Sequence, residues 1–248
     1  MNNAKIFGIA IKRPSIYNYL AEPFRAIRER VRLASFLRKF KSKTKGDGHP
    51  VIVIPGFMGG DRSVKSLTRV LKKSGYQAKT WGMGINLGNL EDLDKLSDKL
   101  EKIFEKTNQK ISLVGWSLGG VYGREMAKKH PEKIRQVITL CSPFNGVDEP
   151  NNAEWIFSLL NRGKRIEDLD AEWLNEVPTP ADVPTTAFYS RKDGVVAWQT
   201  CMEKNEDRIH QNIEIDGSHV GVIFNKEVLP IILDRLQYRE ENWKKYNS

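Results

Sequence analysis

From residue 51 to residue 140, short apolar segments alternate with longer segments of helical period. The segments with the pattern of strands are Val51–Ile54, Tyr76–Trp81, Ile111–Gly115 and Ile134–Leu140, and the first is a short, apolar, β-branched run. The segments between them place leucine, valine and isoleucine at spacings of three and four, which is typical of helices with one buried face. Strand–helix–strand units of this length favour a parallel sheet with helices on both faces. The sequence therefore predicts an α/β protein.

The alternation stops after residue 142 and resumes near residue 185. Two segments inside this interruption have the pattern of helices: Ala153–Leu160 and Ile166–Leu174. An insertion of this kind is expected to lie over the sheet as a small helical cap, at about residues 143–184. The remaining elements are predicted as strands at Thr185–Ser190 and Asn212–Ile215 and a helix at Val228–Leu236. Residues 49–248 are thus expected to form one domain with an inserted cap.

The positive charge of the chain is concentrated in its first 45 residues. This segment holds twelve of the 40 Lys and Arg residues but only two of the 31 acids, so it accounts for the whole net charge of +9. It also contains apolar residues at spacings of three and four, which predict one apolar helical face: Phe24, Ile27, Val31, Ala34 and Leu37. Residues 1–48 are therefore expected to form a basic, amphipathic helical segment.

Three interpretations of this helix are open. The favoured one is a helix that docks on the domain through its apolar face and turns its basic residues to water. In the second, residues 1–45 contact an anionic membrane, where each basic residue near the surface contributes about 1 kcal/mol. The third is contact with nucleic acid, which is not expected because no recognisable reader motif accompanies the charge.

The composition excludes several classes of protein. Hydrophobic residues make up 40% and charged residues 29% of the chain, which is ordinary for a globular protein and unlike disordered or collagen-like chains. No window approaches the ~20 apolar residues of a membrane-spanning helix, and Ile6–Ile11 is too short for a signal-peptide core. Cys141 and Cys201 form neither a disulfide framework nor a zinc pattern. These features predict a cytoplasmic protein that needs no metal or organic cofactor, with peripheral membrane contact left open.

The segment Gly115–Gly120, with the sequence GWSLGG, lies between a predicted strand and a predicted helix. A serine on such a tight turn is held in a strained backbone conformation with its hydroxyl exposed, and the small neighbours let strand and helix approach. The helix start adds backbone N–H groups that face a developing negative charge. Ser117 is therefore predicted to be a nucleophile, with helix capping as the alternative role.

A second glycine-rich segment, Pro55–Gly60, directly follows the first core strand. In sheets of this kind the loop after that strand supplies one N–H of an oxyanion hole, and the residue after the nucleophile supplies the other. Phe57 and Leu118 are the residues expected to provide these two groups. Neither the Walker spacing nor G-x-G-x-x-G is present, so a phosphate-binding loop is not expected.

A base and an acid must follow downstream. Among the four histidines, His219 alone comes just after a predicted strand end, in a loop that can cross the upper edge of the sheet. Asp193 follows the predicted strand Thr185–Ser190, at the sheet edge where functional groups gather in open α/β sheets. Asp216 is very close to His219 in the chain and Asp182 precedes its strand, so both are weaker candidates for the acid.

Three features together resemble the α/β-hydrolase superfamily: the order serine, aspartate, histidine, the tight strand-to-helix turn at Ser117 (the serine elbow), and the upstream glycine-rich loop. Within that superfamily, Val51–Gly60 and Gly115–Gly120 resemble the esterase/lipase branch, including lipase-like and GPI inositol-deacylase-like members. The resemblance covers roughly residues 49–238. Pro55 stands where many lipases carry a histidine, and the basic N-terminal helix has no counterpart in the minimal fold.

The resemblance implies a serine hydrolase that cleaves carboxylic esters through an acyl-enzyme on Ser117, with a small-molecule ester or lipid as substrate. His219 then acts as the base and Asp193 orients it, while Met58 and Trp116 are expected to contact the acyl chain. Two alternatives stay open. One is an acyltransferase or thioesterase that uses the same three residues, and the other is a non-catalytic, membrane-associated scaffold.

Overall fold

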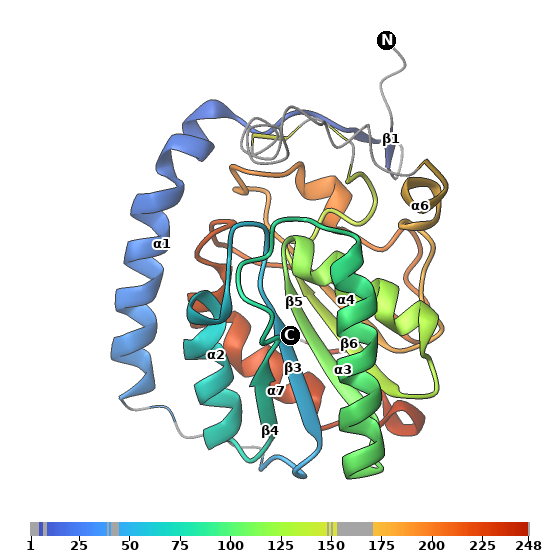
Figure 1. The fold of residues 1–248 in the computed structure, drawn as a ribbon. Helices are drawn as coiled ribbons and strands as arrows, with labels where there is room; N and C mark the ends of the chain where they lie inside the picture. The colour runs from blue at the N-terminus through green and yellow to red at the C-terminus, as the bar shows by residue number, and fades with distance from the viewer. Residues whose placement is uncertain are drawn as a thin grey trace.

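The computed structural model describes residues 5–6, 9–38, 40, 45–147, 149, 151–152 and 171–247 (Figure 1). The expected helix Ala153–Leu160, and the part of Ile166–Leu174 before residue 171, lie outside the described residues. The middle of the predicted cap therefore lies outside the described residues, and only its two ends can be compared.

Six parallel strands form the central sheet. They are β3 (Pro50–Ile54), β4 (Gln77–Thr80), β5 (Ile111–Trp116), β6 (Ile134–Leu140), β7 (Thr185–Tyr189) and β8 (His210–Glu214). Their spatial order is β4–β3–β5–β6–β7–β8, and each neighbouring pair is parallel. The predicted parallel α/β sheet is confirmed. All carboxyl ends of the strands meet at one edge, which is where functional groups gather in such sheets.

Helices cover both faces of this sheet (Figure 1). They are α2 (Asp61–Lys73), α3 (Glu91–Thr107), α4 (Leu118–Lys129), α6 (Ala171–Glu176) and α7 (Val228–Leu236), with short 3₁₀ turns η2 (Trp198–Cys201), η3 (Val222–Phe224) and η4 (Glu240–Asn242). Because successive strand residues point to opposite faces, Val51 and Val53 pack with α2 and α7, whereas Ile52 and Ile54 pack with α3 and α4. Strands β3, β5 and β6 are thus buried on both faces, whereas β4 at one edge of the sheet is partly exposed.

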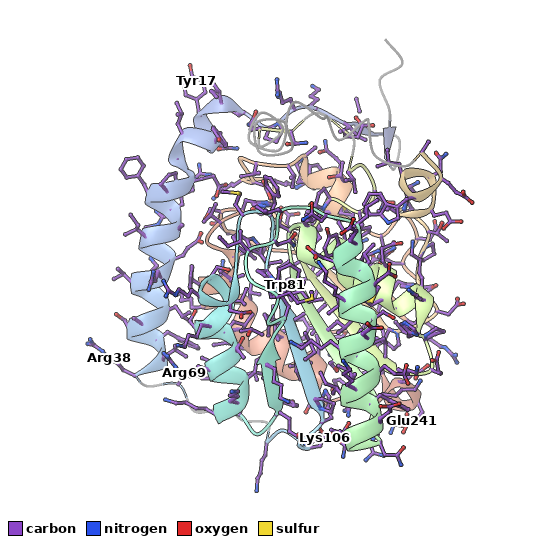
Figure 2. All side chains as sticks on the ribbon, viewed as in Figure 1. Tyr17, Arg38, Arg69, Trp81, Lys106 and Glu241 are labelled. Carbon is purple, nitrogen blue, oxygen red and sulfur yellow. The ribbon has the colours of Figure 1, made fainter. Side chains whose placement is uncertain are left out.

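Before the sheet, the chain forms a short antiparallel pair, β1 (Lys5–Ile6) with β2 (Ile9–Ala10), and then helix α1 (Ile16–Leu37). The predicted N-terminal helix is confirmed, but its favoured docking mode is wrong. Four of the five residues of the predicted apolar face are exposed, and only Leu37 packs on the core. Figure 2 shows Tyr17 and Arg38 at the two ends of α1, both pointing away from the body.

The face that α1 turns inward is partly acidic. Glu22 and Glu29 are only 3% and 7% exposed, and Leu33 is 5% exposed. The two carboxylates accept hydrogen bonds from backbone N–H groups of loops at the carboxyl edge of the sheet. Buried donors without such partners are costly, and these contacts explain why the helix docks with its acids inward and its apolar stripe outward. None of the described helices is both long and apolar enough to cross a bilayer.

Candidate active site

Ser117 occupies the turn between β5 and α4. Its backbone lies at φ 53° and ψ −125°, a region that residues with a side chain rarely adopt. The turn is this tight because Gly115 lacks a side chain: a Cβ there would lie 2.3 Å from the carbonyl oxygen of Gly119. The strained turn holds the serine hydroxyl at the carboxyl edge of the sheet, beside the N-terminus of α4.

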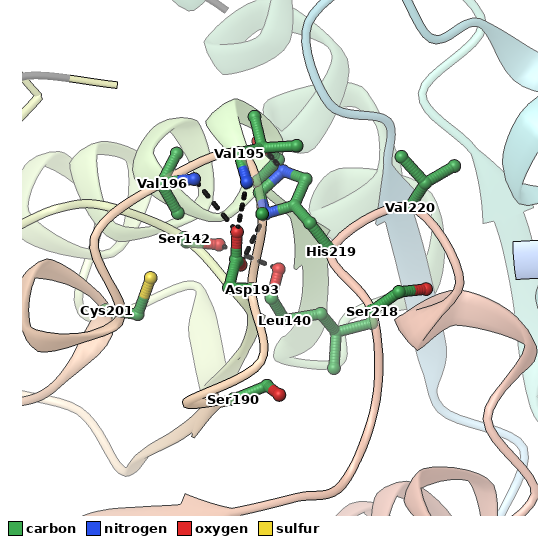
Figure 3. Close-up of polar contacts among 12 residues, drawn as sticks. Leu140, Ser142, Ser190, Asp193, Val195, Val196, Cys201, Ser218, His219 and Val220 are labelled. Carbon is green, nitrogen blue, oxygen red and sulfur yellow. Dashed lines mark hydrogen bonds and ion pairs between the residues drawn. The ribbon is translucent and has the colours of Figure 1, made fainter. Parts of the chain in front are cut away.

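Three side chains from distant parts of the chain are hydrogen bonded in series at this edge. The Ser117 Oγ lies 2.9 Å from His219 Nε2, and His219 Nδ1 lies 2.7 Å from Asp193 Oδ2. Figure 3 shows the contact between Asp193 and His219. The histidine and aspartate are 3% and 4% exposed, while the serine is partly exposed. The structure thus brings together the three residues that the sequence singled out for catalysis.

The turn after β7 fixes the orientation of the Asp193 carboxylate. Its Oδ1 accepts the backbone N–H groups of Val195 and Val196 at 2.8 and 2.9 Å (Figure 3). This leaves Oδ2 facing His219, so that Nδ1 of the imidazole donates to the carboxylate and Nε2 is free to accept the proton of the Ser117 hydroxyl. Asp216 instead pairs with Lys192 in solvent, and Asp182 is exposed.

Two opposing effects set the pKa of His219. Burial of the imidazole by itself lowers the pKa, but the negative charge of Asp193 and its hydrogen bond to Nδ1 outweigh burial, and Glu22 adds a further negative charge. The pKa of His219 is therefore raised above its ordinary value of 6.5. A base with this pKa is a strong proton acceptor once it is neutral.

The glycine-rich loop after β3 lies against the serine. A Cβ on Gly56 would come within 2.9 Å of the Ser117 Cβ, which places the next residue, Phe57, beside the nucleophile. Asn86, which is fully buried, holds this loop: its backbone pairs with Met58 and Gly59, and its side-chain amide donates to a loop carbonyl. Sequence reasoning missed Asn86, because nothing in its local pattern ties it to the loop.

The two residues expected to contact substrate are placed differently. Trp116 is only 9% exposed, and its indole N–H donates to the carbonyl oxygen of His219 at 2.9 Å. Met58, by contrast, is 48% exposed on the oxyanion loop. Three further exposed apolar side chains lie nearby: Ile85 and Leu87, which flank Asn86, and Val220, which follows His219. We call Met58, Ile85, Leu87 and Val220 the apolar rim.

Sequence reasoning also missed the two buried carboxylates of α1. Glu22 accepts the backbone N–H groups of Gly194, His219 and Val220, and Glu29 accepts both the N–H and the hydroxyl of Ser218. The available signal was that these are the only acids among residues 1–45 and are spaced seven residues apart, on one face of a helix.

A second Asp–His–Ser series lies at the opposite edge of the sheet. His49 Nδ1 lies 2.5 Å from Asp47, and its Nε2 lies 2.8 Å from the hydroxyl of Ser112. Burial, assisted by the charge of Arg135, lowers the pKa of His49 to about 4. Ser112 is fully buried inside β5, so no substrate reaches its hydroxyl. The Asp47–His49–Ser112 series therefore has a structural role, and a substrate cannot bind beside its serine.

The remaining candidate residues have structural partners. His130 contacts the Ser97 hydroxyl, and His210 lies between Asp207 and the carbonyl oxygen of Ala181. The two cysteines are free and buried, and burial raises the pKa of both thiols well above its ordinary value. Over the residues whose placement is described, no group of three or more His, Cys, Asp or Glu side chains is arranged to hold a metal.

Curated proteins resemble this chain over different lengths. The carboxylesterase of Bacillus subtilis (strain 168) is 22% identical over 214 residues, which cover 82% of this chain and 85% of the relative. A pimeloyl-(acyl-carrier protein) methyl ester esterase of Legionella pneumophila (strain Lens) is 27% identical over 116 residues, 45% of this chain and 47% of the relative. The chain spans less than half of the length of this esterase and of two further curated relatives.

Solved structures share the fold. The mature lipase BlEst2 of Bacillus licheniformis superimposes with a TM-score of 0.58 at 15% identity, over 81% of this chain and 95% of that chain. Aspergillus fumigatus lipase B gives a TM-score of 0.61 at 16% identity, over 81% of this chain and 56% of that chain. These likenesses confirm the α/β-hydrolase fold that the sequence predicts.

One family model, described as palmitoyl protein thioesterase, matches residues 50–191. The match begins at β3, includes the serine elbow and runs through β7. It ends two residues before Asp193, so the acid and the base lie beyond it. Because the matched segment makes up more than half of the residues, the chain belongs to the palmitoyl protein thioesterase family.

Proposed function

We propose that this chain is a serine hydrolase that cleaves carboxylic esters through an acyl-enzyme on Ser117. The observation that carries the proposal is the series of hydrogen bonds from Ser117 through His219 to Asp193, with the serine on a strained turn at the start of a helix. A nucleophile, a base and a group that orients the base are the minimum set for this chemistry.

In the first half of the reaction, the Ser117 Oγ attacks the ester carbonyl while His219 Nε2 takes its proton. Asp193 keeps the imidazole in the tautomer that exposes Nε2 and stabilises the imidazolium that forms. The imidazolium then gives its proton to the leaving alcohol. In the second half, His219 removes a proton from water while the water oxygen attacks the acyl carbonyl. The bond between the acyl carbon and the Ser117 Oγ then breaks, the imidazolium returns its proton to Oγ, and the carboxylic acid leaves.

The tetrahedral intermediate needs donors for its negative oxygen. We assign these to the backbone N–H groups of Phe57 and Leu118, which belong to the loop beside the serine and to the first turn of α4. The first N–H groups of a helix have no partner within the helix and carry its positive dipole end. Loss of one such donor typically lowers turnover by ~10²–10³.

The substrate is inferred to carry a hydrophobic acyl group. Met58, expected from the sequence, and the three other members of the apolar rim offer exposed apolar surface next to the nucleophile. Trp116 acts here mainly through its hydrogen bond to the His219 carbonyl, which helps to position the base. Isolated surface apolar residues need no explanation, but a group of them around a nucleophile favours an acyl chain.

Family membership favours a second candidate, hydrolysis of long-chain acyl thioesters. The same three residues serve both reactions, because a thiolate is an easier leaving group than an alkoxide. Transfer of the acyl group to an alcohol or thiol is the third possibility, and it differs only in which acceptor attacks the acyl-enzyme. Product analysis in the presence of added alcohol or thiol separates transfer from hydrolysis.

Ser117→Ala is expected to abolish turnover without unfolding the protein. We expect kcat on p-nitrophenyl esters and on acyl thioesters of matched chain length to fall by at least ~10³-fold, while Tm stays nearly unchanged. The matched control is Ser112→Ala, which removes the serine of the second series and is expected to keep kcat. A fluorophosphonate probe should label the wild type and Ser112→Ala but not Ser117→Ala.

Each alternative has its own outcome in this experiment. Turnover retained by Ser117→Ala contradicts the proposed mechanism. A wild-type protein that neither turns over substrate nor reacts with the probe is a scaffold. A kcat/KM on thioesters at least tenfold above that on esters makes the chain a thioesterase.

We further propose that residues 143–184 form a cap over this site. In support, Trp173 and Val177 of the α6 region pack with Val121 of α4 and with Phe144, close behind the nucleophile helix. The helical segments expected between residues 153 and 170 lie outside the described residues.

Finally, we propose that the outer face of α1 binds an anionic lipid surface. Six large apolar side chains are exposed there, at spacings that keep them on one side of the helix: Ile16, Tyr17, Leu20, Phe24, Ile27 and Val31. Phe24 is 77% exposed and Tyr17 is 82% exposed. Burying such a side chain contributes about 1.5–3 kcal/mol, and an apolar stripe of this size usually marks an interaction site.

Charge favours lipid over a second copy of this chain. Arg28, Arg30 and Arg32 are exposed on α1, while both acids of the helix are buried against the body. Two copies packed through this face would bring like charges together with no acidic partner, whereas an anionic membrane neutralises them. The apolar rim lies close to this helix, because Val220 donates its backbone N–H to Glu22 of α1. Glu22 lies on the face of α1 opposite the exposed stripe, so the helix would stand between a bound lipid surface and the loop that carries His219.

The test replaces three outer residues at once, by Leu20→Ser, Phe24→Ser and Ile27→Ser. We expect the wild type to co-sediment with vesicles that contain phosphatidylserine, less at high salt, and the triple variant to bind at least tenfold more weakly. Pure phosphatidylcholine vesicles and circular dichroism serve as controls. A wild type that does not bind anionic vesicles contradicts the proposal, and so does one that sediments as a dimer which the variant disrupts.

A further inference from the structure

Helix α1 joins the two loops that carry the acid and the base. The loop after β7 carries Asp193, and the loop after β8 carries His219. Glu22 Oε1 accepts the N–H of Gly194 at 2.9 Å and the N–H of His219 at 3.0 Å, and its Oε2 accepts the N–H of Val220 at 2.9 Å. One carboxylate oxygen thus bridges the residue after the acid and the base itself.

The approach of α1 to these loops is unusually close. A Cβ on Gly194 would lie 2.5 Å from backbone atoms of Asn18 and Tyr19 in the first turn of α1. Arg25 strengthens the same contact by donating to the carbonyl oxygen of Lys192 at 2.9 Å. Seven residues after Glu22, Glu29 accepts both donors of Ser218. Helix α1 is therefore hydrogen bonded to the loops after β7 and β8 over about two of its turns.

We infer that Glu22 is a positioning residue for catalysis, which fixes the separation of Asp193 and His219 and places a negative charge beside the base. This inference rests on the proposed function. Geometry carries the first part, because a carboxylate that bonds both loops sets the distance between them. Its charge carries the second part, because no ion pair with a lysine or arginine neutralises it within the described chain.

Among the described residues, three charged or hydrogen-bonding groups lie around His219, two at its imidazole and one at its backbone N–H. Asp193 comes from the loop after β7, Glu22 from α1, and the Ser117 hydroxyl from the elbow. Glu29 bonds Ser218 and not His219. The two acids of α1 are therefore a matched pair: both are buried carboxylates that hold the same loop, but only Glu22 acts on the base.

The experiment compares Glu22→Gln with Glu29→Gln in the full-length protein. Glutamine keeps the size of the side chain but removes its charge and points an amide N–H₂ at backbone donors. For Glu22→Gln we expect kcat to fall about 10–100-fold, as for a small misplacement of a catalytic group, with KM little changed. We also expect the acid limb of the kcat/KM profile to move to lower pH. For Glu29→Gln we expect the acid limb to stay in its wild-type position.

Several results would overturn the inference. Equal losses of kcat in both variants, with neither acid limb moved, would mean that the carboxylates only hold the fold. A Glu22→Gln variant with wild-type kcat and profile would exclude any role of Glu22 in catalysis. If Glu22→Gln does not fold, Glu22→Asp replaces it: we expect this charged but shorter side chain to keep the acid limb in place while kcat falls, and an unchanged kcat refutes the inference.

The proposed function and this inference fail in different ways. If Ser117 is not the nucleophile, the wild type itself neither turns over esters nor reacts with the fluorophosphonate probe. If Glu22 does not position the base, the wild type is active and labelled, and the Glu22 variants match it.

Discussion

Ser112 and Ser117 lie five residues apart, and each is hydrogen bonded to a histidine whose other nitrogen meets an aspartate. Their surroundings differ in every respect that matters for catalysis. Ser117 sits at a positive φ angle beside a helix N-terminus and is partly exposed, whereas Ser112 is fully buried within a strand. Hydrogen bonding in series is therefore not enough to identify a nucleophile. Backbone strain, access and nearby N–H donors make the distinction.

At the same scale, the raised pKa of His219 predicts how activity depends on pH. The protonated imidazole cannot accept the Ser117 proton, so kcat/KM should fall as the pH drops through the folded-state pKa. Because this pKa lies above the ordinary histidine value of 6.5, the acid limb should have its midpoint above that value. A profile of kcat/KM against pH with a short-chain ester tests this. A midpoint below the ordinary value would contradict the expected influence of Asp193 and Glu22.

At the scale of elements, periodicity predicted the core and not the docking of α1. The strands of the sheet and the helices α2, α3, α4 and α7 were predictable because apolar residues that face a sheet dominate the pattern of most of them. The expected strand at Asn212–Ile215 is displaced toward the N-terminus, since β8 begins at His210. For α1 the same rule points to the wrong face. Its inner face is selected by loop N–H groups that need acceptors, and those loops lie more than 160 residues away in the chain.

The catalytic residues were predictable for a related reason. A serine elbow, and polar residues just after strands, are local patterns whose meeting point follows from a parallel sheet. Asn86 and Glu22 act through the backbone of other segments, and such contacts leave no local pattern. Their roles emerge only when the loops are placed in space.

At the scale of the whole molecule, α1 connects the face proposed to bind lipid with the loops that carry Asp193 and His219. Deletion of residues 1–45 therefore cannot isolate the lipid contact, because it also removes both carboxylates. We expect the truncated chain to fold, since one of the two main core clusters consists wholly of residues after position 49. Its Tm should nevertheless fall, because the packing of Leu33 and Phe36 on the other cluster is lost.

The truncated chain should also lose about 10–100-fold in kcat on a short-chain ester, a substrate that needs no membrane. The size follows from the loss of Glu22 as the bridge between the two loops. The triple variant of the outer face, by contrast, should lose vesicle binding with its catalytic loops still held. Measuring kcat, Tm and vesicle co-sedimentation for both proteins separates the two faces of α1. A truncated chain with wild-type kcat would show that the helix serves only the lipid surface, and that the loops hold their geometry without it.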